Sequence, residues 1–179
     1  MKIAYADPPY PGCAHLYRNH PDYAGEVDHQ TLVMRLQGYD GWVLHTHVAG
    51  LRMMERNHIL PLEGIRICQW FKPFASYKKG VKVAYAYEPI IIKPVRSPVV
   101  PSEETSRDWI DEAVREPITM RRGFTGAKPE RVCFWIFQIM GMEPDDQLID
   151  LFPGTRAVSV AWEKWRTREQ NEQRIFDAV

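Results

Sequence analysis

Short apolar segments alternate with segments of helical pattern along most of this 179-residue chain. The apolar segments are as long as single strands and lie at residues 2–6, 41–47, 65–71, 83–95 and 147–152. Helical patterns cover residues 31–36, 51–58, 107–115, 129–140 and the stretch after Pro153-Gly154 through Arg168. Strands that alternate with helices form a largely parallel sheet, because each helix returns the chain to the start of the next strand. The alternation predicts an α/β fold whose sheet has about five strands, with helices on both faces.

Length and composition predict one domain over residues 1–179, because domains of roughly 100–200 residues are the norm. With 45% hydrophobic and 26% charged residues, the chain has ordinary globular composition, which excludes disordered and fibrous classes. No apolar run approaches the ~20 residues of a membrane span. The first residues have no signal-peptide layout, so we expect a cytoplasmic protein without a membrane partner. The three cysteines lack C-x-x-C spacing, which argues against a disulfide framework or a cysteine zinc site.

Charge is balanced overall but unevenly distributed. The chain has 23 basic and 23 acidic residues, yet residues 66–96 contain seven basic residues against the single acid Glu88, a net charge of +6. Aromatic residues such as Trp70 and Phe71 lie among these lysines and arginines. Such a segment is either a solvated face or a surface that binds nucleic-acid phosphates and stacks bases. Charge alone leaves both interpretations open.

Asp7-Pro8-Pro9-Tyr10 directly follows the first predicted strand, and its chemistry suits one task. The exocyclic amine of a nucleobase is a poor nucleophile, because its lone pair is delocalised into the ring. A carboxylate and a backbone carbonyl that each accept one N–H would localise that lone pair, and Asp7 and the Pro8 carbonyl offer both groups. The prolines fix the loop. Tyr10 provides a flat face on which an extruded base can stack.

Two further segments have the properties of an anion site and a ligand crevice. Lys128 precedes Pro129 at a predicted helix start, where a cation and free backbone amides can hold a carboxylate. Asp150 and Phe152 end a strand just before a helix, the position at which open α/β sheets bind ligands. If the strands that carry Asp7 and Asp150 are neighbours, both sites meet at one edge of the sheet.

At these residues the chain resembles the amino-methyltransferases of DNA and RNA, in which Asp-Pro-Pro-Tyr is the catalytic motif. Further segments resemble this family in the same order. They are Trp70-Phe71-Lys72-Pro73, Tyr87-Glu88-Pro89-Ile90-Ile91-Ile92, Gly126-Ala127-Lys128-Pro129-Glu130 and Asp150-Leu151-Phe152-Pro153-Gly154-Thr155. The last resembles the Phe-x-Gly-x-Gly cofactor loop. Its position after the catalytic motif matches the permuted branch found in phage and restriction-modification adenine-N6 methyltransferases, which would place the protein in a host cytoplasm if it is phage-encoded.

The resemblance implies a single-domain, methyltransferase-like (Rossmann-like) fold and S-adenosylmethionine as the cofactor. The implied catalytic residues are Asp7, Pro8, Pro9 and Tyr10. The implied cofactor-binding residues are Asp7, Lys128, Pro129, Asp150, Phe152, Gly154, Thr155 and Arg156, with Lys128 on the cofactor carboxylate. The transfer needs no metal, because the sulfonium is already activated and in-line geometry supplies most of the acceleration.

The chain departs from the family at two points. Arg156 stands where the family loop has a second glycine, which lets the backbone approach the cofactor closely. Arg156 either obstructs that approach or contacts a cofactor carboxylate or a phosphate. Eleven residues follow Arg168, fewer than two strands require, so we expect a sheet that lacks two strands of the full fold. One of those strands supplies the acid that binds the ribose in the family.

The remaining candidates concern the substrate. His45 and His47 repeat every second residue on a predicted strand and therefore share a face, and His15 or His20 is a conceivable third metal ligand. No third ligand has diagnostic spacing, so we predict no metal and take His45 as a pocket residue. The expected substrate-binding residues are His15, Tyr17, Arg18, His45, Trp70, Lys72, Lys78, Lys79 and Lys82.

Together these features predict transfer of a methyl group to the N6 amine of a flipped adenine in DNA. The alternative is a methyltransferase-fold module that has lost catalysis and binds nucleic acid or a partner protein. RNA adenine and DNA cytosine-N4 substrates share the chemistry and stay open. The sequence fixes no oligomeric state, and a dimer stays open.

Overall fold

The structure is a computed structural model of the chain. It describes residues 1–18, 23–61, 63–73, 82–83, 85–97, 106–112 and 128–177, with side chains as far as residue 168. The element order is β1 (Lys2–Ala6), η1 (Ala14–Tyr17), α1 (His29–Leu36), β2 (Gly41–His45), α2 (Val48–Arg56), β3 (Arg66–Phe71), β4 (Tyr87–Lys93), β5 (Trp109–Asp111), α3 (Glu130–Ile139), β6 (Gln147–Asp150) and α4 (Ala157–Asp177).

The six described strands form one sheet in the order β5-β3-β4-β2-β1-β6. β1 lies parallel to both β2 and β6, and its Tyr5 pairs with Val43 on one side and Asp150 on the other. β4 runs antiparallel to β2 and to β3, and β3 is parallel to β5. The amino end of β4 therefore reaches the same edge as the carboxyl ends of the other five strands.

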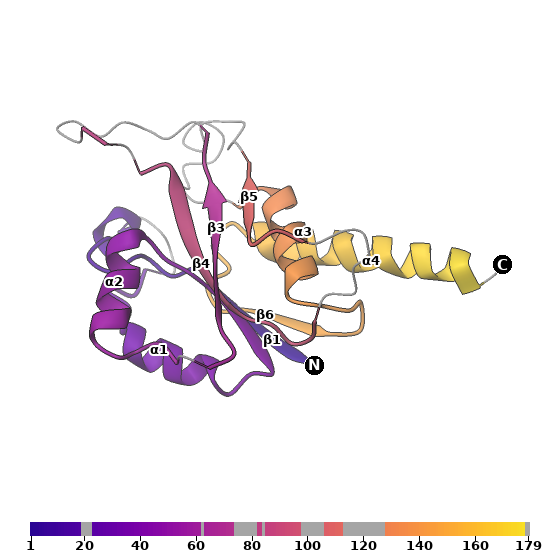
Figure 1. The fold of residues 1–179 in the computed structure, drawn as a ribbon, viewed down its shortest axis with the longest axis horizontal. Coiled ribbons are helices and arrows are strands. Elements are labelled where there is room, and N and C mark those ends of the chain that lie inside the picture. Colours follow the sequence, from indigo (N-terminus) through magenta and orange to yellow (C-terminus); the bar gives the residue numbers. More distant parts are fainter. Residues whose placement is uncertain are drawn as a thin grey trace.

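Helices cover both faces of this sheet (Figure 1). Alternate strand residues point to opposite faces. On one face, Ile3, Val43 and Ile90 join a core with α3 and α4, in which Phe137, Trp162 and Trp165 pack at ring-centroid distances of 5.2–5.8 Å. On the other face, strand residues such as Ala4 and Leu44 pack with α1 and α2. The predicted α/β class with a mostly parallel sheet is confirmed.

The helix predicted over residues 107–115 is wrong for its described part, because Trp109–Asp111 forms β5. Pairing with β3 and the hydrogen bond from Trp70 Nε1 to the Glu112 carbonyl (2.9 Å) hold this segment extended. The helix predicted over residues 51–58 begins earlier, at Val48, and ends at Arg56. The last helix is longer than predicted and continues to Asp177.

Two further features complete the description of the fold. Asp28 caps α1, since its carboxylate accepts the backbone N–H groups of Gln30 and Thr31. β6 has β1 as its one neighbouring strand within the described residues, as expected for a sheet that lacks strands on that side. No described helix combines the length and apolar character that spanning a membrane requires.

Candidate active site

Polar side chains from four neighbouring strands and from the start of one helix meet at the end of the sheet where the parallel strands have their carboxyl ends. Asp7 follows β1, His45 ends β2, and Glu88 lies near the amino end of β4. Lys72 follows β3, and Lys128 precedes α3. Because side chains alternate along a strand, His45 shares a face with Val43 and Glu88 with Ile90, which is the face covered by α3 and α4.

Lys128 lies between Asp7 of the predicted catalytic motif and the buried Glu88. It is buried, and its ammonium lies 3.1 Å from Asp7 Oδ2 and 2.9 Å from Glu88 Oε1. Burial alone would lower the pKa of Lys128, but the charges of Asp7 and Glu88 outweigh it and raise that pKa above its ordinary value. The lysine is therefore a permanent cation. Asp7 is about one-fifth exposed, and its Oδ1 has no hydrogen-bond partner within the described part of the chain.

Glu88 is the centre of the cluster. It is 3% exposed and receives three short contacts, from His45 Nδ1 at 2.5 Å, Lys72 Nζ at 2.6 Å and Lys128 Nζ at 2.9 Å. Burial opposes its charge, but Lys128, His45 and Lys72 outweigh that effect and hold the pKa of Glu88 well below its ordinary value. Two carboxylates and two ammonium groups make the cluster electrically neutral.

A hydrogen-bonded chain continues from Glu88 into the core. Tyr5 and His45 are fully buried, and the Tyr5 hydroxyl lies 2.6 Å from His45 Nε2. Burial raises the pKa of Tyr5, and burial together with Lys128 lowers the pKa of His45. The tyrosine therefore stays protonated, and its O–H donates a hydrogen bond to Nε2 of a neutral imidazole. The Nδ1–H of that imidazole donates a hydrogen bond to Glu88. This tautomer satisfies every polar atom in the chain of contacts.

Tyr10 is half-buried beside this cluster and is backed by a histidine. Its ring lies parallel to that of His47, with centroids 5.2 Å apart and an interplanar angle of 4°. His47 is the N-cap of α2, and its Nδ1 accepts the backbone N–H of Gly50 at 3.3 Å. Burial and the charge of Glu88 raise the pKa of Tyr10. The pair presents one aromatic layer next to Asp7.

The predicted cofactor loop lies immediately beside the catalytic motif, because β6 pairs with β1. Asp150 Oδ1 accepts the Phe152 backbone N–H at 3.2 Å, and burial raises the pKa of Asp150. Gly154 and Arg156 both have positive φ, at 44° and 60°. The backbone N–H of Arg156 donates to the Pro153 carbonyl at 2.6 Å. The Arg156 carbonyl accepts the backbone N–H of Val160, in the first turn of α4. Arg156 thus adopts a glycine-type backbone conformation while its side chain is exposed.

The other sequence-predicted site residues are more dispersed. Trp70 is buried, with the ammonium groups of Lys72 and Lys128 at 4.3 and 5.4 Å from its ring centroid. Tyr17 is half-buried, and its burial together with the charge of Asp7 raises the pKa of Tyr17. The remaining exposed candidates are His15, Arg18, Lys82 and Thr155. Lys78, Lys79 and His20 lie outside the described residues.

Asp7, His45 and Glu88 also have the geometry of a cation site, since one ligand atom from each lies within 4.8 Å of the others. The Lys128 ammonium contacts two of the three, and both His45 nitrogens are hydrogen-bonded. The cluster thus provides its own cation from the chain. The pair of histidines considered from the sequence is separated here: His45 is in the core, and His47 stacks on Tyr10.

Comparison with known proteins identifies the fold. The chain is similar to the crystal structure of the M1.HpyAVI–SAM complex, with a TM-score of 0.57 and 13% identity over 92% of this chain and 77% of that one. A second crystal structure of M1.HpyAVI gives a TM-score of 0.54 and 12% identity over 92% and 76%. The fold is methyltransferase-like. No protein-family model and no curated protein matches the sequence. At this identity the similarity is one of fold.

Three residues of this cluster were missed by the sequence analysis as site residues: Tyr5, Glu88 and His47. Tyr5 looks like an ordinary strand residue, and nothing in the sequence distinguishes it. Glu88 carried a signal, because it is the one acid in a segment of seven basic residues and precedes three isoleucines of an apolar strand. A carboxylate in such a strand is buried and therefore needs cationic partners.

Proposed function

We propose that the protein transfers a methyl group from S-adenosylmethionine to the N6 amine of adenine in DNA. The observation that carries the proposal is the adjacency of β1 and β6, which puts the Asp7-Pro8-Pro9-Tyr10 motif beside the Asp150–Arg156 loop with Lys128 at the same edge. The structural resemblance to a DNA methyltransferase supports the same function. The chemistry of the residues gives each of them a distinct role.

Asp7 and the Pro8 carbonyl would each accept one hydrogen bond from the target amine. Lys128 holds Oδ2 of Asp7, which orients the carboxylate and leaves Oδ1 to accept one N–H. The Pro8 carbonyl accepts no backbone hydrogen bond from the described residues and can accept the other. These two bonds localise the nitrogen lone pair toward the methyl donor. Transfer would break the bond between the methyl carbon and the cofactor sulfur, which would leave as a neutral thioether, and would form the N–C bond. The amine nitrogen would then carry the positive charge, and Asp7 would accept the proton that this nitrogen releases.

Tyr10 would hold the base. His47 covers one face of its ring, so the ring is fixed in orientation before a base arrives. The opposite face of Tyr10 is the one that can stack on an extruded adenine, which brings its amine to Asp7. The 3₁₀ turn η1 follows directly, and the Glu26 carboxylate braces this loop by accepting the N–H groups of Gly12 and Ala14 at 3.1 and 3.2 Å.

The residues fit S-adenosylmethionine in charge and in backbone conformation. An ammonium has three donors. Asp7 and Glu88 accept two from Lys128, which leaves a third for the carboxylate of the cofactor. Asp150, Phe152, Gly154 and Thr155 would line the rest, and a Cβ built on Gly154 meets nothing closer than 3.7 Å. When bound, the cofactor supplies a methyl group already activated by its positive sulfur. Arg156 has the positive φ that a glycine would adopt there, and its side chain is exposed.

A second function has one observation in its favour. β6 has no neighbour beyond β1 among the described strands, so the strand that carries the ribose-binding acid in the family has no counterpart there. A methyltransferase-fold module that binds nucleic acid or a partner protein without catalysis would tolerate this. It predicts DNA binding without measurable affinity for S-adenosylmethionine.

Calorimetric titration with S-adenosylmethionine, with and without DNA, separates the two functions. The methyltransferase binds the cofactor, and Lys128→Met weakens that binding whereas Lys164→Met, at an exposed surface pair with Glu130, leaves it unchanged. Absence of binding by the wild-type chain in both conditions would favour the binding module. Labelled methyl transfer to DNA, to RNA and to strands that lack adenine then identifies the substrate and the base.

A further inference from the structure

The face of β3 opposite the candidate active site is partly uncovered. Cys68 and Trp70 point into the core with α3 and α4, so Ile67, Gln69 and Phe71 point the other way. On that second face, α1 and α2 cover β1, β2 and β4. Ile67 on β3 and Trp109 on β5 are each 39% exposed. Large apolar side chains grouped on an uncovered sheet face mark a binding surface more often than isolated exposed ones.

Phe71 on β3 contacts one aromatic ring on each of the two neighbouring strands. Phe71 lies 6.1 Å from Tyr87 of β4 and 5.9 Å from Trp109 of β5, measured between ring centroids. The Phe71 and Trp109 rings are nearly perpendicular, at 80°. The guanidinium of Arg107 lies 5.1 Å from the Trp109 ring centroid. A platform of aromatic rings on a sheet, with a cation at its border, is the arrangement with which proteins stack unpaired bases.

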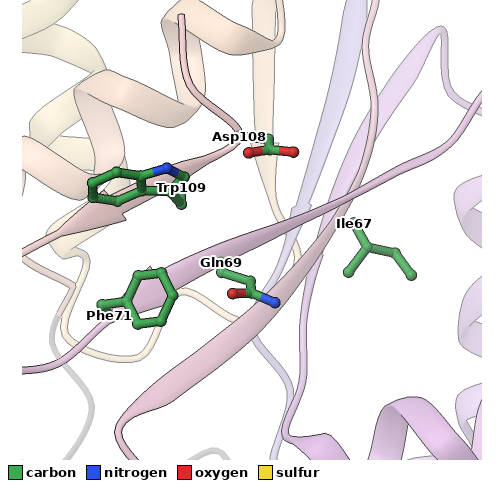
Figure 2. Close-up of a pocket in the computed structure, with 5 residues that line it drawn as sticks. All are labelled: Ile67, Gln69, Phe71, Asp108 and Trp109. Carbon is green, nitrogen blue, oxygen red and sulfur yellow. The ribbon is translucent and has the colours of Figure 1, made fainter.

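The cavity between these rings also contains polar groups. It has a volume of about 430 Å³ and is lined by Ile67, Gln69, Phe71, Asp108 and Trp109 (Figure 2). The Gln69 amide and the Asp108 carboxylate have no side-chain hydrogen bond to any other described residue. An amide can pair with two edge atoms of a base, and a carboxylate accepts from an exocyclic amine. The volume belongs to the class of pockets that hold small molecules, and a lining of five residues is too small for a protein partner.

The cavity adjoins the candidate active site through the end of β3. Phe71 is in the cavity, whereas its neighbours Trp70 and Lys72 contribute to the cluster around Glu88 on the other face. A single strand of nucleic acid that crosses this edge could place one base at Tyr10 and another in the cavity. An intact duplex could not, because its bases are stacked and paired.

We infer that the cavity of Ile67, Gln69, Phe71, Asp108 and Trp109 binds an unpaired nucleobase of the same strand that carries the target base. This inference rests on the proposed function for its choice of ligand. It makes the protein selective for single-stranded DNA, or for duplexes opened near the target. Stacking on Phe71 and Trp109 provides the affinity, and Gln69 and Asp108 favour bases with an exocyclic amine over thymine.

The test measures binding of a fluorescein-labelled single-stranded oligonucleotide by anisotropy, without cofactor. Phe71→Leu and Trp109→Leu keep an apolar side chain in place but remove the aromatic face. Each should raise Kd roughly five- to 150-fold, since stacking contributes about 1–3 kcal/mol per base. Phe71→Tyr should restore near wild-type binding. Met34→Ala, an exposed apolar residue on α1 outside the cavity, is the matched control and should bind like wild type.

A second probe makes the result independent of protein stability. A strand of the same length with abasic sites flanking the target base should bind about as weakly to wild type as the intact strand binds to Phe71→Leu. Equal affinity of wild type for intact and abasic strands, or unchanged binding by both leucine variants, would overturn the inference. Methyl transfer is measured separately. If the wild-type chain transfers methyl groups but its binding does not depend on the aromatic side chains, only the inference about the cavity is refuted. If its binding depends on those side chains but it transfers no methyl group, only the proposed function is refuted.

Discussion

Replacing Glu88 by glutamine tests the electrostatic cluster that supports the catalytic motif. The substitution keeps shape and one acceptor oxygen but removes the charge that His45, Lys72 and Lys128 contact at 2.5–2.9 Å. A hydrogen bond to a charged group contributes about 1.5–3 kcal/mol, so the three contacts amount to roughly 4.5–9 kcal/mol before the cost of burying Glu88 is subtracted. That cost is several kcal/mol. The buried Lys128 would keep Asp7 as its one counter-charge.

We therefore expect Glu88→Gln to lower the free energy of unfolding by about 3–5 kcal/mol, the range observed when one partner of a buried ion pair is removed. For a chain of this size the melting temperature would fall by roughly 6–20 °C. Circular dichroism melting at pH 7 measures this. Glu130→Gln is the matched control, because its partner Lys164 is exposed and such pairs contribute less than about 1 kcal/mol.

The pH dependence gives a second, independent readout. The folded pKa of Glu88 is well below its unfolded value of about 4.3, so its contribution is complete above that pH and is lost as the pH falls through the folded pKa. The difference between wild type and Glu88→Gln should therefore shrink in acid. If Glu88→Gln melts within the range of Glu130→Gln at pH 7, or if its difference from wild type grows in acid, Glu88 does not stabilise the fold as a buried carboxylate.

Three further predictions concern two backbone positions and one ion pair at the amino end of β1. Arg156→Gly should raise the melting temperature by roughly 2–8 °C, because a non-glycine residue at φ 60° costs about 1–2 kcal/mol, whereas the control Arg156→Ala should not. Burial opposes the charge of Asp146, but Arg96 outweighs it and lowers the pKa to about 2, so Asp146 should stabilise by on the order of 2 kcal/mol above pH 4 and lose this between pH 4 and 2. Urea unfolding of wild type and Asp146→Asn across that range checks the sign. Gly50→Ala would place a Cβ 2.9 Å from His47 Nδ1, so it should destabilise by about 1–3 kcal/mol and weaken the stacking on Tyr10, seen as reduced DNA affinity.

The sequence predicted the sheet well where strands are apolar on both faces. Residues 2–6 and the isoleucines of β4 are such strands, and burial of both faces leaves a continuous apolar run that only a central strand explains. β5 was not predictable in this way. Its three residues, Trp109–Asp111, have no period of their own, and the neighbouring acids favour a helix until β3 offers a pairing edge.

The residues of the candidate site also differ in whether the sequence alone could predict them. Asp7, Tyr10 and Lys128 belong to local motifs, and local motifs are visible in a sequence. Glu88 becomes a partner of Lys128 only because β4 runs antiparallel and thus brings its amino end to the edge where the other strands end. The direction of a strand in its sheet is a property of tertiary pairing, so the pattern of residues 83–95 showed an extended segment without its orientation.

In the proposed function, Asp7 directs methyl transfer to a base amine. Mass spectrometry of nucleosides from unmethylated single-stranded DNA, incubated with the protein and S-adenosylmethionine, tests it most directly. We expect N6-methyldeoxyadenosine with the wild-type chain and its loss with Asp7→Asn, whose folding is checked by circular dichroism. No methylated nucleoside from the wild-type chain, or undiminished methylation by Asp7→Asn, would contradict it.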